Sequence, residues 1–133
     1  MSGTSTDRPQ GRSMSSDISN AVVHLLSEYT GRGPTKARTY INDDLISVVL
    51  RDTLTKGERS LIADGNIDIV LDTRRAYQAA MKQELITTVE NHSGRSVLAF
   101  MSENHIDPDI AVESFVLAPQ RVTEIVASDE IEA

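Results

Sequence analysis

Residues 35–50 read TKARTYINDDLISVVL, and this stretch decides the fold. From Thr35 to Ile41 polar and apolar residues roughly alternate, which is typical of a strand with one buried face. Leu45 to Leu50 is rich in β-branched residues, and Asn42-Asp43-Asp44 between the two runs has turn chemistry. The stretch therefore predicts a β-hairpin. Neighbouring Val and Leu residues in its second strand indicate burial on both sides.

A helix is expected before this hairpin and a short one after it. Apolar residues from Ile18 to Tyr29 follow the spacing of one helical face, with Asp17 as the expected N-cap and Gly31 as the end. Thr55 to Glu58 matches a capping box, which predicts a short helix that ends near Gly65.

A long helix and two more strands complete the expected fold. An apolar stripe begins at Ile67, and Gly94 closes the helix. Val97 to Met101 and Ile110 to Leu117 are predicted to form a second strand pair, which Pro119 ends.

The order helix-strand-strand occurs twice, which indicates a diverged internal repeat. Gly31-Arg32 corresponds to Gly94-Arg95, and Tyr40 to Asp43 corresponds to Phe100 to Glu103. Two such αββ units predict an α+β fold with one four-stranded antiparallel sheet and helices packed on one face. We expect a second copy of the chain to cover the other face in a homodimer.

The composition of the chain narrows its class. The 133 residues are enough for one domain, with a disordered N-terminal tail over 1–16, a folded unit over 17–119 and an acidic tail over 120–133. The net charge of −7 disfavours nonspecific binding to nucleic acid. There is no cysteine, no apolar run of bilayer length and no signal peptide in 1–16, so we expect a cytoplasmic protein without membrane insertion.

A basic segment, Gly31 to Arg38, is the first candidate site. Its glycines let backbone amides approach a ligand, and its cations suit phosphate, carboxylate or bicarbonate. The alternative is a helix end followed by a strand with a basic solvent face. The segment does not have Walker A spacing. The candidate anion-binding residues here are Arg32, Gly33, Lys36 and Arg38.

Arg74 and Arg75 in the long helix extend this candidate set. Arg74 falls on the apolar stripe, where a charge needs a partner. Asp43, Asp44 or an acidic loop would supply an ion pair, and a ligand contact is the other interpretation.

The loop between the last two strands is the third candidate. Glu103, His105, Asp107 and Asp109 alternate, as ligands of a divalent ion would, but these are also ordinary loop residues around a proline. We assign no metal and no cofactor. The loop candidates are Asn42, Asp43, Asn104, His105 and Asp107.

Catalysis has little support in the sequence. With no cysteine, and without a G-x-S-x-G or S-x-x-K motif, no nucleophile is placed beside a base. We therefore expect a protein that is not an enzyme.

Three segments of the chain resemble the MpsC-like family of small bacterial domains. They are Gly31 to Asp44, Thr73 to Tyr77 and Ala99 to Asp109, and the resemblance covers about Ile18 to Pro119. The family label is linked to a Na+-translocating, membrane-potential-generating system whose other components resemble inorganic-carbon uptake machinery. The resemblance implies a soluble accessory or regulatory module beside a membrane Na+ or bicarbonate transport system, with a transport component as protein partner. The alternative is a small-anion or nucleotide sensor that uses Gly31 to Arg38.

Overall fold

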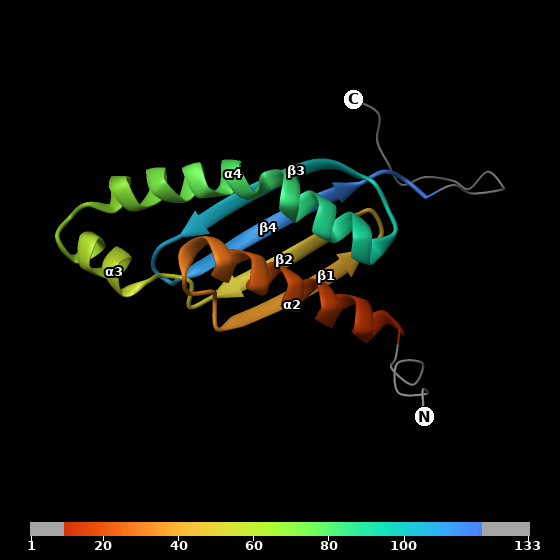
Figure 1. The fold of residues 1–133 in the computed structure, drawn as a ribbon, viewed down its shortest axis with the longest axis horizontal. Coiled ribbons are helices and arrows are strands. Elements are labelled where there is room, and N and C mark those ends of the chain that lie inside the picture. Colours follow the sequence, from red (N-terminus) through yellow and green to blue (C-terminus); the bar gives the residue numbers. More distant parts are fainter. Residues whose placement is uncertain (1–9, 121–133) are drawn as a thin grey trace.

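The computed structural model describes residues 10–120 of the chain, and Figure 1 shows their arrangement. In chain order the elements are α2 (Gln10–Thr30), β1 (Lys36–Asn42), β2 (Leu45–Arg51), α3 (Lys56–Ala63), α4 (Ile67–Ser93), β3 (Val97–His105) and β4 (Ile110–Leu117). The predicted α+β fold is confirmed, and so is the hairpin at residues 35–50.

The four strands form one antiparallel sheet in the order β1-β2-β4-β3. Each hairpin keeps its own two strands together, and β2 and β4 join the hairpins at the centre of the sheet. Leu45 lies opposite Val116 and Arg51 opposite Ile110. The β1–β2 turn and the β3–β4 loop therefore lie at opposite ends of the sheet, so these two hairpin tips do not meet.

Helices α2 and α4 lie across one face of the sheet (Figure 1). The core forms between these helices and alternate residues of the two central strands. Its buried members are Ile18, Val22 and Leu25 of α2, Met81, Leu85 and Val89 of α4, Ile46, Val48 and Leu50 of β2, and Ala111, Phe115 and Leu117 of β4. This confirms the prediction that helices pack on one face.

The opposite side of the sheet, which we call the open face, carries no described helix. Burial along β2 alternates, so within the described chain only one side of this strand is buried, contrary to the expectation from its neighbouring Val and Leu residues. Tyr40 and Met101 on the open face are each 50% exposed, and Leu45 is 40% exposed.

The capping predictions around the two later helices are confirmed. The Glu58 backbone N–H donates to Thr55 Oγ1 at 3.1 Å, and the Thr55 N–H donates to the Glu58 carboxylate at 2.9 Å, which completes a capping box. Gly94 ends α4 with φ 72°, a left-handed conformation that glycine adopts without strain.

Helix α2 begins earlier than the sequence indicated. It starts at Gln10, so Asp17 lies inside the helix and is not its N-cap, and residues 10–16 are helical rather than part of a tail. Met14 packs against the core one turn before Ile18, and this contact extends the apolar stripe. Residues 1–9 and 121–133 of the predicted tails lie outside the described residues.

Candidate functional site

Arg74 of α4 is the centre of a polar cluster at one end of the sheet. Its side chain is 14% exposed and forms a bidentate pair with the Glu58 carboxylate, with N···O distances of 2.8 and 2.7 Å. The remaining N–H groups donate to the Thr53 hydroxyl, the Thr53 carbonyl and the Asn104 side-chain oxygen, each at 2.9 Å. All five guanidinium N–H groups are thus used within the protein.

The partner of Arg74 differs from the acids that the sequence suggested. Asp43 and Asp44 lie at the other end of the sheet, where Arg95 donates to the Asp43 carbonyl at 2.7 Å and to the Asp44 carboxylate at 2.5 Å. Arg74 therefore makes the ion pair with Glu58, and none of its N–H groups remains for a ligand.

Glu58 keeps its charge in this cluster. Burial raises the pKa of its carboxyl, but hydrogen bonds from Arg74 and from the Thr55 backbone outweigh burial, so the pKa of Glu58 lies below its usual value. The same carboxylate caps α3 and pairs with α4, which joins the two helices.

Arg32 is held by the segment that follows β2. It donates to the carbonyls of Asp52 and Leu54 at 2.9 and 3.2 Å and to the Asp52 carboxylate at 2.9 Å. Arg59 binds the second oxygen of that carboxylate at 2.8 Å. A hydrogen bond from Thr35 and the two arginines hold the pKa of Asp52 below its usual value.

Asp109 connects the β3–β4 loop to this cluster. It accepts hydrogen bonds from the Thr53 hydroxyl at 2.7 Å and from the Leu54 N–H at 3.0 Å. Burial raises the pKa of Asp109, but these bonds outweigh it and lower the pKa overall. Since Thr53 also accepts from Arg74, the structure brings Arg32, Arg74 and Asn104, one from each candidate segment, around residues 52–54.

The other basic candidates lie elsewhere. Lys36 is directly opposite Arg51 in the β1–β2 register, and Arg38 stacks over Tyr40 at 5.3 Å from the ring centre. Lys36, Arg38 and Arg51 line a shallow hollow of about 260 Å³ on the open face and form no ion pair with any described residue. The basic segment is therefore divided between two sides of the sheet.

Gly33 and Arg75 have local roles. A Cβ at Gly33 would lie 2.4 Å from Ser27 Oγ and 3.0 Å from the Val23 carbonyl, so only glycine fits against α2 there. Arg75 pairs with Asp72 one turn away at 2.7 Å on an exposed surface.

The loop candidates do not form a metal site. His105 Nδ1 lies 2.8 Å from the Pro108 carbonyl, and Asp107 is in the same turn. Asn42 and Asp43 are at the far end of the sheet. Within residues 10–120, no group of three or more His, Cys, Asp or Glu side chains could hold a metal ion.

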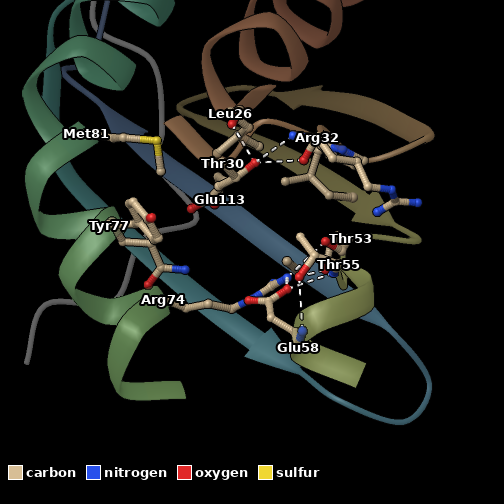
Figure 2. Close-up of a pocket in the computed structure, with 14 residues that line it drawn as sticks. Leu26, Thr30, Arg32, Thr53, Thr55, Glu58, Arg74, Tyr77, Met81 and Glu113 are labelled. Carbon is tan, nitrogen blue, oxygen red and sulfur yellow. Dashed lines mark hydrogen bonds and ion pairs between the residues drawn. The ribbon is translucent and has the colours of Figure 1, made fainter. Parts of the chain in front are cut away.

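A pocket with a buried acid lies beside the Arg74 cluster. It has a volume of about 60 Å³ and is bounded by α2, α4, the start of α3 and the inner face of the sheet. Figure 2 shows Glu113 of β4 between Thr30, Tyr77 and Met81, with Arg74 and Glu58 nearby. Glu113 is 2% exposed, and burial raises the pKa of its carboxyl. Its Oε1 has no hydrogen-bond partner among the described residues.

Sequence reasoning missed Glu113, although the sequence contains a signal for it. Every second residue of β4 points to the same side of the sheet. The apolar residues of this set are buried, namely Ala111, Phe115 and Leu117, and Glu113 lies among them. Strand alternation therefore places Glu113 on the core face. An acid at such a position is a candidate functional residue because its burial is costly.

Fold and pocket together define a small α+β domain of two layers, one sheet and one layer of helices. The chain belongs to the MpsC family, described as Na+-translocating membrane potential-generating system (MpsC), and the family match covers residues 10–119. The matched region thus begins at Gln10, the residue at which α2 begins in the structure. Searches of curated proteins and of solved structures returned no match. Over residues 10–120, no helix has the length and apolar character to cross a bilayer.

Proposed function

We propose that this domain is a non-enzymatic accessory or regulatory component of a membrane Na+-translocating system and acts through protein contacts in the cytoplasm. The family description names such a system. A component that does not itself cross the membrane over its described residues would reach that system by binding one of its membrane proteins.

The open face is the observation that carries this proposal. One side of the sheet is packed against α2 and α4, whereas the other side exposes Tyr40, Leu45 and Met101 to solvent. Exposed apolar side chains on an unpacked sheet face are typical of a protein-binding surface, although α4 exposes Ile67, Ile69 and Tyr77 as well.

Site-specific photo-crosslinking in cells that naturally produce the protein tests the proposal. A photoreactive residue in place of Met101 should crosslink to a membrane ion-transport component, which mass spectrometry identifies. The control places the same residue at Lys82, an exposed position on α4. Crosslinks from Met101 to soluble proteins alone, or equal membrane crosslinks from Lys82, would contradict the proposal.

A small-anion sensor is the second candidate function. Like charges directly opposite in a strand pair are destabilising, and Lys36 lies opposite Arg51. Phosphate, bicarbonate or a nucleotide would relieve that repulsion. Calorimetry should detect saturable binding that Arg38→Ala abolishes and Arg75→Ala preserves; absence of binding by the unaltered protein ends this candidate.

A further inference from the structure

The Glu113 pocket contains a buried acid whose Oε1 atom has no hydrogen-bond partner among the described residues. Arg32 and Arg74, the two arginines that line the pocket, are paired with Asp52 and Glu58. Because all five Arg74 N–H groups are already used, Arg74 has no hydrogen bond left for Glu113. Ser102, opposite Glu113 in the β3–β4 register, and the nearby Arg74 charge both act to lower the pKa of Glu113, but burial outweighs them. Glu113 Oε1 still has no hydrogen-bond partner among the described residues.

The walls of the pocket define the rest of a suitable ligand. Leu50, Met81 and Ala111 supply apolar surface beside Glu113, and Leu26 and Pro34 line the same space. One water needs about 10–15 Å³, so a pocket of about 60 Å³ admits a ligand of only a few heavy atoms. A ligand with a cationic head and a short apolar chain matches both the acid and these walls.

We propose that the Glu113 pocket binds a small organic cation, a primary ammonium group on a short alkyl chain. The ammonium group donates to the unpartnered Glu113 Oε1 and supplies the missing positive charge. The alkyl chain replaces water against the apolar walls. This inference is independent of the open face and of the proposed membrane partner.

Binding of the cation is linked to release of a proton. Burial raises the pKa of Glu113, and a bound cation would act in the opposite direction by stabilising the carboxylate. The other titratable or charged groups that line the pocket are Arg32, Glu58, Arg74 and Tyr77. Affinity should therefore rise as the pH is raised through the range in which Glu113 ionises.

Calorimetry and NMR titration of the full chain test this inference. Methylammonium and propylammonium should bind saturably and shift backbone resonances in β4 and α4. Propanol, which has a similar shape and no charge, should bind at least tenfold more weakly. Sodium and potassium chloride are the inorganic comparisons. Equal binding of propanol, or binding of sodium without alkylammonium, would overturn the assignment.

Variants locate the site. Glu113→Gln should lower the affinity for propylammonium at least tenfold, whereas Glu28→Gln, at an exposed acid of α2 that pairs with His24, should leave it unchanged. Ala111→Val narrows the pocket, keeps Glu113 and should also weaken binding. Unchanged affinity in Glu113→Gln, or no saturable binding of either amine at millimolar concentration, would refute the proposal.

Discussion

At the residue scale, one inward-facing acid distinguishes the core of this domain. Glu113 occupies a position of β4 whose neighbours on the same face, Ala111 and Phe115, are buried and apolar. Burial of a carboxyl group without a partner lowers stability when the group must ionise. The presence of a buried acid at this position is the reason to assign a binding role to it.

The pH dependence of stability should reveal this acid. Because the pKa of Glu113 is raised in the folded protein, its contribution is favourable at pH values below the unfolded pKa and is lost as pH rises toward the folded pKa. The stability of Glu113→Gln relative to the unaltered protein should therefore increase as the pH rises from about 4 to 7, and should be independent of pH well below the unfolded pKa. Each unit of raised pKa corresponds to about 1.4 kcal/mol.

Urea unfolding at several pH values measures that difference. Glu58 and Asp109, whose pKa values are lowered, lose stabilising charge as the pH falls, but both proteins share that loss. An unchanged difference from pH 4 to pH 7 would show that Glu113 does not titrate abnormally.

At the element scale, short helix α3 depends on its connections. None of its residues is buried, so burial contributes little to its position. Its capping box is joined to α4 through Arg74, and the preceding Thr53-Leu54 segment is bound by Asp109. These bonds place α3 over one end of the sheet and form one wall of the Glu113 pocket.

Removal of Arg74 should destabilise this corner strongly. Arg74→Ala leaves the part-buried Glu58 charge and the Asn104 oxygen without their partner, and loss of one partner from a buried pair costs roughly 3 kcal/mol or more. Arg75→Ala, one residue away, removes only an exposed pair and should cost less than about 1 kcal/mol. Denaturant unfolding of both variants measures the costs, and equal costs would contradict the assigned role of Arg74.

At the scale of the whole molecule, the open face is self-complementary. The strand registers place Arg38, Val49, Val112 and Glu103 in one row across the sheet, with opposite charges at its two ends. A second copy, turned about a two-fold axis parallel to the strands, would place Glu103 over Arg38 and Val112 over Val49. The homodimer expected from the sequence stays a prediction, and in this arrangement the second copy would occupy the open face in place of a membrane partner.

Charge reversal tests the dimer. Arg38→Glu and Glu103→Arg should each weaken self-association because each places like charges together. The double variant Arg38→Glu/Glu103→Arg restores opposite charges and should recover it. Sedimentation equilibrium measures the dissociation constants. The interface would be contradicted if the unaltered protein were monomeric. It would also be contradicted if the single variants dimerised as tightly as the unaltered protein.

Most of the secondary structure could be predicted from local pattern. The turn at Asn42 to Asp44, the capping box at Thr55 and the left-handed end at Gly94 each depend on neighbours within a few residues. The start of α2 could not be predicted in this way, because it depends on the packing of Met14 against core residues of other elements. Arg32 and Arg95 each donate to a carbonyl just beyond a central strand, Asp52 after β2 and Ala118 after β4. The duplication that this correspondence suggests stays a prediction.

The sequence by itself determined the family, the element order and the antiparallel hairpins, because periodicity, caps and turns act over short distances. Only the tertiary structure decided that Arg74 pairs with Glu58 rather than with Asp44, and that Lys36 and Arg38 lie apart from Arg32. It also decided that Glu113 lines a pocket. Such partners come from different elements, and their distances depend on strand order and on helix packing, which no local pattern specifies.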